Sequence, residues 1–282
     1  MNIAVVTDST ADLPKDVADA HNVRVVPLNV LFGTDEYKDG VTIDNDEFYR
    51  RLQSSPELPT TSQPSPGEFA AVYRELAESS DAIISIHVSQ ALSGTYASAL
   101  QAKAELGAES CRIEVVDSRQ ASVSLGLTVT AVARIMAGGA DIDTATAAAK
   151  DISGRARFYA MLDTLEYLQK GGRVGRAQAF IGGLLKVVPI ITVEDGEVQP
   201  VERPRTRRRG LERLKALTRA RMPFESLAVL HTTEPEVAAE LASDLADVAP
   251  DGEVMTAQIG SVVGTYAGPG TLGVGFVTAA AP

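Results

Sequence analysis

The chain repeats one local pattern three times: a short run of β-branched residues, a few small polar residues, and a stretch with helical spacing. The pattern occurs in "NIAVVTDSTADLPKDVADAHN", in "DAIISIHVSQALSGTYASALQAKAEL" and in "CRIEVVDSRQASVSLGLTVTAVARIMAGG". Repeated units of this kind place their strands in a parallel sheet, and ligands bind outside the carboxyl ends of such strands. The sequence therefore predicts a parallel sheet, with residues 7–10, 89–95 and 117–122 as places where a ligand could bind.

The pattern changes after residue 150, which predicts a second domain. A helical stretch, a Gly-rich turn and a hairpin around residues 194–197 are followed by strand, helix, strand, Gly-rich turn and strand. The Gly-rich "GTYAGPGTLGVGF" has two interpretations, tight turns in a final hairpin or a backbone packed closely against a ligand. We predict an α/β protein with two domains, residues 1–150 and 151–282.

Composition excludes several classes of protein. The chain has 282 residues, 45% of them hydrophobic and 22% charged, which is typical of a globular protein. A net charge of −11 argues against non-specific nucleic-acid binding. Cys111 is the single cysteine, and the N-terminus lacks the features of a signal peptide, so we expect a cytoplasmic protein. No apolar run approaches the roughly 18 residues that a membrane span needs.

The stretch "LPTTSQPSPGEF" is rich in hydroxyl and amide side chains and contains no cation. Ser65 and Glu68 have the spacing of a capping box at the start of a helix. Pro59 and Pro64 keep residues 60–62 extended, because the residue before a proline avoids helical geometry. The row of hydroxyls is either ordinary loop solvation or a neutral donor set for a ligand rich in acceptors.

Ser93 stands between a predicted strand and the helix that follows it. It is either an ordinary N-cap or part of an anion site, in which Gly94 would let a ligand approach the backbone. A nucleophilic role for Ser93 is disfavoured, because "ALSGT" is not the elbow of a hydrolase. Asp8, Asp117 and Asp163 each end an apolar run, but their spacing matches no metal-binding motif, so we expect no metal site.

Two stretches carry basic residues in an otherwise acidic chain. Arg173 and Arg176 lie in "GGRVGRAQ", which is a credible anion-contacting turn but not a phosphate loop. Residues 202–221 contain nine Lys or Arg against two Glu. This segment is either a solvated helix face or a docking patch for an acidic partner or a phosphate.

Seven motifs in order resemble the DegV family of bacterial fatty-acid-binding proteins. They are "VTDSTADLP", "VVPLNVLFGTDEYKDG", "LPTTSQPSPGEF", "IHVSQALSGTYASA", "VVDSRQASVSLGL", "LDTLEYLQKGGRVGRAQAFIGGLLKVVPII" and "IGSVVGTYAGPGTLGVGF". The resemblance implies a Rossmann-like, DegV-type N-terminal domain with a parallel sheet and a C-terminal α/β domain with a mixed sheet. It also implies a long-chain fatty acid between them, with its head group at the N-terminal domain and its acyl tail in the C-terminal one.

The resemblance also assigns roles to residues. Thr61 and Ser93 would hydrogen-bond the carboxylate, with Ser62 and the Gly94 amide nearby. The family often has His in "GTHTGPG", where this chain has Tyr266 in "GTYAGPG". Tyrosine can donate a hydrogen bond but is not a cation at neutral pH.

Some family members work with a fatty acid kinase and present the bound acid for conversion to acyl phosphate. By resemblance, Arg173, Arg205 and Arg207 would then contact the acyl phosphate or the kinase. We therefore expect a non-catalytic carrier without a cofactor. One alternative is a hydrolase or phosphotransferase that uses Asp8 or Ser93, and another is a regulatory docking protein with a structural lipid.

Overall fold

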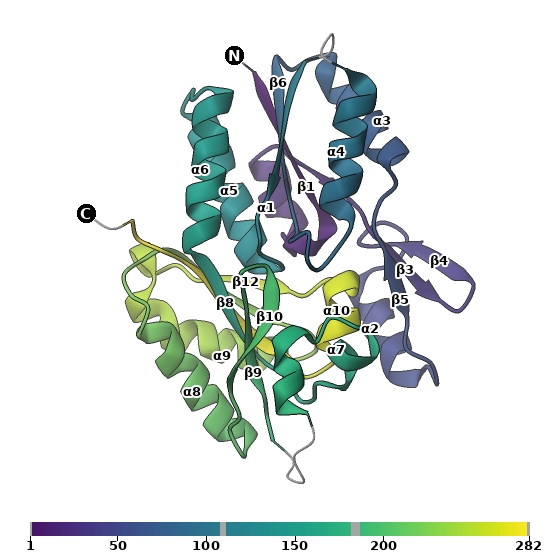
Figure 1. The fold of residues 1–282 in the computed structure, drawn as a ribbon. Helices are drawn as coiled ribbons and strands as arrows, with labels where there is room; N and C mark the ends of the chain where they lie inside the picture. Colours follow the sequence, from purple (N-terminus) through teal and green to yellow (C-terminus); the bar gives the residue numbers. More distant parts are fainter. Residues whose placement is uncertain (1, 108–110, 182–186, 281–282) are drawn as a thin grey trace.

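The computed structural model describes residues 2–107, 111–181 and 187–280, which form two lobes built on separate sheets (Figure 1). The first sheet has four strands in the order β2-β1-β6-β7, and every pairing is parallel. This confirms the parallel sheet predicted from the repeated units. Its strands are β1 (Ile3–Asp8), β2 (Val23–Val26), β6 (Ala82–His87) and β7 (Arg112–Asp117).

Helices cover both faces of the parallel sheet, with α3 and α4 on one side and α5 and α6 on the other (Figure 1). Ser65 and Glu68 form the predicted capping box of α3. The side chain of Glu68 and that of Ser65 each accept from the other's backbone N–H, which satisfies two donors at the helix start. These helices are α3 (Pro66–Ala77), α4 (Thr95–Leu106), α5 (Val123–Ala137) and α6 (Ile142–Arg155), and the short helix α1 (Lys15–Ala20) lies between β1 and β2 in the chain.

The second sheet has six strands in the order β10-β9-β8-β13-β11-β12. β11 and β12 are parallel and the other pairings are antiparallel, which confirms the mixed sheet. The predicted hairpin joins β9 to β10. The strands are β8 (Ala156–Met161), β9 (Ile190–Glu194), β10 (Glu197–Glu202), β11 (Phe224–His231), β12 (Met255–Gln258) and β13 (Leu272–Thr278).

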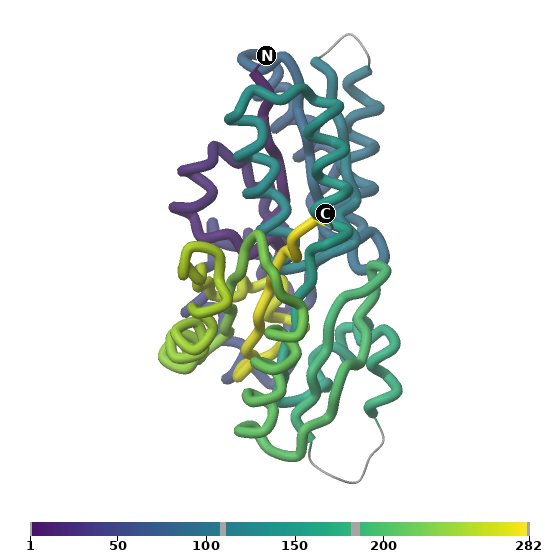
Figure 2. Tube along the Cα trace, turned by 90° about the vertical axis from the view of Figure 1, so that its left-hand side faces the viewer, coloured from purple at the N-terminus to yellow at the C-terminus, as the bar shows by residue number. Residues whose placement is uncertain are grey.

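The two faces of the second sheet have different partners. Helices α8 (Arg207–Arg219) and α9 (Pro235–Leu245) pack on its outer face, where Tyr159 and Met161 of β8 point. Phe158 and Ala160 alternate with them and belong to the cluster shared with α5. Seen from the side, the lobe with the N-terminus stands above the green and yellow segments of the second lobe (Figure 2).

The segment after Val26 forms a small third sheet that the sequence pattern did not predict as separate. Pro27 interrupts the run of β-branched residues, so that β3 (Asn29–Phe32) leaves the parallel sheet. It pairs with β4 (Asp35–Lys38) and with β5 (Thr60–Ser62). Residues 60–62 are therefore extended, as predicted, and α2 (Asn45–Ser54) lies between β4 and β5 in the chain.

The Gly-rich C-terminal stretch had two interpretations, and the structure does not show the first of them, a final hairpin. Residues Ser261–Ala267 form a helix, α10, and β13 pairs with β8 and β11 instead of β12. Gly264 explains the close packing of this helix, because a Cβ there would stand 2.4 Å from the hydroxyl oxygen of Tyr49. The glycine thus serves a tight helix contact rather than a turn.

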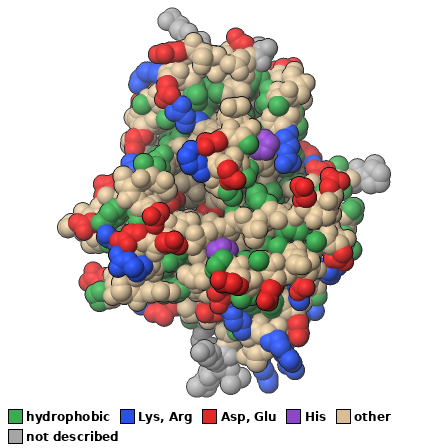
Figure 3. All heavy atoms as spheres, turned by 180° about the vertical axis from the view of Figure 1, so that it is seen from behind, with side chains coloured by type: hydrophobic (Ala, Val, Ile, Leu, Met, Phe, Trp, Pro, Cys, Tyr) green, Lys and Arg blue, Asp and Glu red, His purple; other side chains and the backbone are tan. Residues whose placement is uncertain are grey.

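Two further features concern the surface. Among the described residues, no helix is long and apolar enough to cross a membrane. On the face seen from behind, acidic and basic side chains are interspersed (Figure 3). The exposed ion pairs of the protein include Arg219–Asp247 and Arg112–Asp143.

Candidate functional site

A pocket lies between the carboxyl ends of the parallel sheet and the inner face of the second sheet. Its apolar floor comes from strands of the second sheet, on which alternate side chains face inward. Val262 and Val263 of α10 form one wall, and Val88 and Leu92 form the opposite one. The floor residues are Phe158, Ala160, Leu162, Ile191, Val193, Val198, Leu230 and Gly273.

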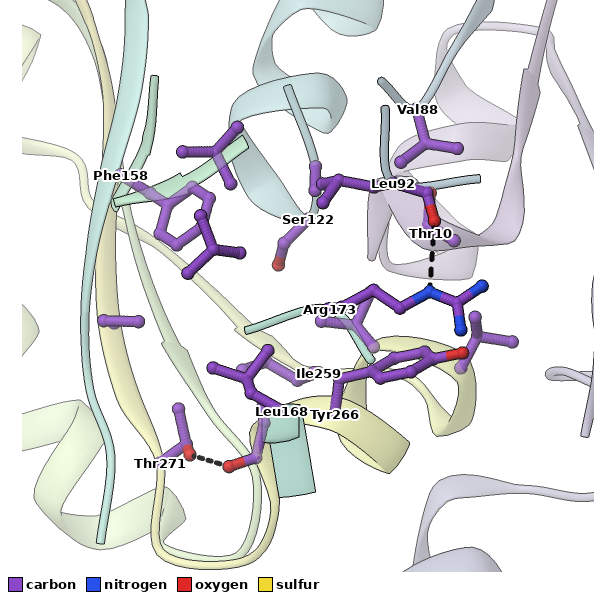
Figure 4. A pocket seen from close by; sticks show the side chains of 18 of the residues that line it. Thr10, Val88, Leu92, Ser122, Phe158, Leu168, Arg173, Ile259, Tyr266 and Thr271 are labelled. Carbon is purple, nitrogen blue, oxygen red and sulfur yellow. Dashed lines mark hydrogen bonds between the residues drawn. The ribbon is translucent and has the colours of Figure 1, made fainter. Parts of the chain in front are cut away.

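Polar side chains gather where the pocket opens. Thr61 of β5 and Tyr266 of α10 share a hydrogen bond of 2.5 Å between their hydroxyl oxygens. Ser93, from the turn before α4, lines the same pocket. The guanidinium of Arg173 stands 5.1 Å from the centre of the Tyr266 ring (Figure 4). The structure thus brings together Thr61, Ser93 and Tyr266, three residues proposed from the sequence.

Arg173 is the cation of this mouth. It follows α7 (Glu166–Lys170), and its side chain donates to the carbonyl of Gly171 at 2.7 Å and to that of Leu92 at 3.3 Å. Gly171 must lack a side chain, because a Cβ would stand 2.5 Å from the Tyr266 ring. Arg173 was predicted to contact an acyl phosphate or a partner, and its charge lies directly beside the predicted head group residue Tyr266.

Ser62 and Gly94 do not line the described pocket. Ser62 points to the other face of β5, where its hydroxyl accepts from the Asn29 amide at 3.1 Å. Gly94, rather than Ser93, is the N-cap of α4. A Cβ at Gly94 would stand 2.9 Å from the amide nitrogen of Gln63, so this glycine makes room for a Gln63 side chain that does line the pocket.

Sequence reasoning did not single out Thr10 and Ser122 as ligand contacts. Both line the pocket at the predicted strand ends, and buried carboxylates orient both hydroxyls. Thr10 donates to Asp8, and Ser122 donates to Asp12 at 2.5 Å. Their position after a strand was the available signal, but the pattern could not show which side chain of each turn faces inward.

Asp12 is buried beside other acids. Burial raises the pKa of Asp12 to about 8, hydrogen bonds from Ser122 and Gly260 oppose this rise, and the nearby Asp39 and Asp8 add to it. Burial also raises the pKa of Asp39. These carboxyls lie at the contact between the two lobes, close to but not at the mouth of the pocket.

Asp8 belongs to a buried chain of hydrogen bonds with the order of a catalytic triad. Its carboxylate is 2.9 Å from Nδ1 of His87, and Nε2 of His87 is 2.7 Å from the Ser85 hydroxyl. Tyr73 donates to Ser85 at 2.8 Å. All of these side chains are fully buried, and Ser85 does not line the pocket. A substrate in the pocket could not reach this serine, so the arrangement serves the core.

The other two predicted arginines lie outside the pocket lining. Arg207 is half-buried and forms ion pairs with Asp163 and Glu234, so its charge is used within the protein. Arg205 is exposed on the segment before α8. Within the described part of the chain, no group of three His, Cys, Asp or Glu side chains is arranged to hold a metal ion.

Comparisons with known proteins give the same picture. Residues 2–279 match the family model for uncharacterised proteins of the DegV family. The Protein DegV of Bacillus subtilis is 37% identical over 279 residues, which cover 97% of this chain and 98% of that protein.

Two solved structures extend the likeness to the fold. A structure describing fatty acid binding by a DegV family protein from Thermus thermophilus is 34% identical, with a TM-score of 0.91 over 99% of this chain and 100% of that one. A stearic acid-binding protein from Eubacterium ventriosum is 28% identical, with a TM-score of 0.85 over 98% of both chains. The chain belongs to the DegV family.

Proposed function

We propose that this protein binds one long-chain fatty acid in the pocket between its sheets, with the carboxylate at the polar mouth and the acyl tail on the apolar floor. The observation that carries the proposal is the joining of two environments in one pocket. Thr61, Tyr266 and Arg173 lie at the opening, and only apolar side chains or glycine come from β8, β9 and β13 of the floor. The fatty acids described for the Thermus and Eubacterium relatives support this ligand class.

The tail supplies most of the binding free energy in this proposal. Burying about a dozen methylenes at ~0.8 kcal/mol each would contribute roughly 10 kcal/mol before the entropic costs of binding. The contacts that the protein makes with the head group therefore need to offset only the desolvation of one carboxylate.

The residues at the mouth can compensate for this desolvation with hydrogen bonds and one positive charge. One hydroxyl proton is used in the bond between Thr61 and Tyr266, which leaves the other free to donate to a carboxylate. Ser93 offers a second hydroxyl, and Arg173 supplies positive charge. Thr61 and Ser93 come from the proposed domain 1–150, and Tyr266 comes from 151–282, so the two proposed domains share the head group site while the second one houses the tail.

In this proposal the protein is a carrier and not a catalyst, because the serine of the buried Asp8 chain is closed to the pocket. A finer proposal is that a separate fatty acid kinase phosphorylates the presented carboxylate. Its support is the family resemblance and the exposure of Arg173 at the mouth, where a carboxylate would face solvent. Acyl phosphate formation from the loaded protein, ATP and such a kinase would test it, and loaded protein that the kinase leaves unchanged would contradict it.

Native mass spectrometry of the purified protein tests the main proposal. We expect one bound molecule per chain, released on denaturation and identified as a long-chain fatty acid. A protein that is empty and also takes up no added palmitate or stearate would overturn the proposal.

A further inference from the structure

Helix α10 lacks a capping side chain of its own. Its N-cap is Gly260, which has no side chain to accept from the first N–H groups of the helix. The helix nevertheless carries much of the pocket wall. Val262 and Val263 lie in its first turn, and Tyr266 lies one turn later at the mouth.

Two buried aspartates from the beginning of the chain take the place of the missing cap. One oxygen of Asp39 accepts from the Ser261 backbone N–H at 3.0 Å and from the Ser261 hydroxyl at 2.6 Å. Asp12 accepts from the Gly260 N–H at 2.9 Å. Both aspartates are 6% exposed, and they are separated from their partners by 222 and 248 residues.

The contacts of Asp12 join the two sides of the pocket. One carboxyl oxygen accepts from Gly260 before α10, and the other accepts from Ser122 before α5, whose hydroxyl lines the pocket. A third contact fixes the same segment, because the Tyr49 hydroxyl of α2 donates to the carbonyl of Ile259 at 2.8 Å.

The geometry points to Asp12 and Asp39 as positioning residues of the head group site: they fix the first turn of α10 and thereby hold the Tyr266 hydroxyl against Thr61. The two aspartates do not line the pocket themselves and act through the helix. This inference rests on the proposed function, since it concerns the residues that would bind the carboxylate. It differs from a general stabilising role, because it predicts a larger effect on head group recognition than on binding of the tail.

The test separates the head group from the tail by comparing palmitate with its methyl ester. Both ligands bury the same tail, but only palmitate presents a carboxylate. We expect Asp39→Ala to raise the Kd for palmitate at least tenfold and the Kd for methyl palmitate less than twofold. Asp39→Asn keeps an acceptor oxygen and should restore most of the palmitate affinity. Equal changes for both ligands, or no change for either, would overturn the positioning role.

Two further variants keep the test decisive. Ser261→Ala removes one donor without disturbing the carboxylate, and it should raise the Kd for palmitate about threefold with the ester unaffected, even if Asp39→Ala fails to fold. Asp141 caps α6, which does not line the pocket, by accepting from Thr144 N–H at 2.8 Å. Asp141→Ala is the matched control and should leave the ratio of the two Kd values unchanged.

The wild-type protein separates failure of this inference from failure of the proposed function. If it binds neither ligand, or binds both equally, the proposed carboxylate site is wrong. If it prefers palmitate but Asp39→Ala, Asp39→Asn and Ser261→Ala retain that preference, only the positioning role is wrong.

Discussion

At the scale of single residues, Arg173 adds a positive charge to the mouth of the pocket. The hydroxyl side chains of residues 60–62 alone gave no indication of this charge. Arg173→Gln keeps a polar side chain but removes the charge beside Thr61 and Tyr266. Hydrogen bonds to charged groups contribute about 1.5–3 kcal/mol, and exposure at the mouth reduces this through solvent screening. We expect about a tenfold rise in the Kd for a long-chain fatty acid, measured by titration calorimetry.

Arg176 provides the matched control for this prediction. It lies three residues further on, is exposed, and is 3.7 Å from Glu197 without lining the pocket. Arg176→Gln should leave the Kd unchanged. An equal loss of affinity in both variants would show that general electrostatic attraction, and not the position of Arg173, explains the effect.

Residue types and spacing predicted the local backbone of part of this site. The flanking prolines predicted an extended backbone at Thr61, and Ser93 follows a strand and precedes a helix, but the pattern left an ordinary structural role open for both residues. Only the family resemblance selected them as ligand contacts. Arg173 was predicted to contact an anion, but its place beside Tyr266 was not predictable, since their distance depends on how α7 packs on α10. The sequence pattern did not indicate helix α10 for a similar reason. Local sequence at Gly260 offers no cap, and the cap comes from Asp39.

At the scale of the elements, two small residues on neighbouring strands set the depth of the pocket floor. Gly273 of β13 is paired with Ala160 of β8, and both line the pocket. A Cβ at Gly273 would meet the Tyr159 carbonyl oxygen at 3.4 Å and Leu230 at 3.5 Å, which are ordinary contacts, and it would project from the face of β13 that lines the pocket.

Gly273→Val should therefore shorten the preferred acyl chain by about three carbons, because the added Cβ and two methyl groups fill the space of roughly three methylenes. The measurement is a competition among saturated fatty acids of different length, read by mass spectrometry of the bound fraction. Its control is the free energy of unfolding of the empty variant, which should stay close to the wild-type value. An unchanged length distribution with an intact fold would contradict the assignment of the floor to the tail.

At the scale of the whole molecule, the lobes meet through buried acids, and this makes stability depend on pH. The pKa of Asp12 is about 8 in the folded protein, against about 3.9 for an unperturbed aspartate. Between these values the folded state binds more protons than the unfolded state. The free energy of unfolding must therefore fall as pH rises through this window.

The acids that face Asp12 act in the same direction as its burial, and the hydrogen bonds from Ser122 and Gly260 act against it. Asp39 and Asp8 raise the pKa of Asp12, and burial, together with Asp12 and Asp39, raises that of Tyr49 on α2. Asp12→Asn keeps an acceptor for the Gly260 N–H and an uncharged group beside Ser122, but it cannot lose a proton. We expect urea unfolding between pH 6 and 7.5, values chosen for the experiment within about two units below the folded pKa, to show that the free energy of unfolding falls less steeply with pH in this variant.

The size of the difference follows from linkage. One proton bound only by the folded state corresponds to about 1.4 kcal/mol per pH unit, and coupling to Asp39 and Asp8 spreads this over a wider range. Asp141→Asn, at the exposed cap of α6, is the control and should not remove the slope. Identical slopes for the wild type and Asp12→Asn would mean that Asp12 is charged in the folded protein, and that the lobes are held together around a buried anion.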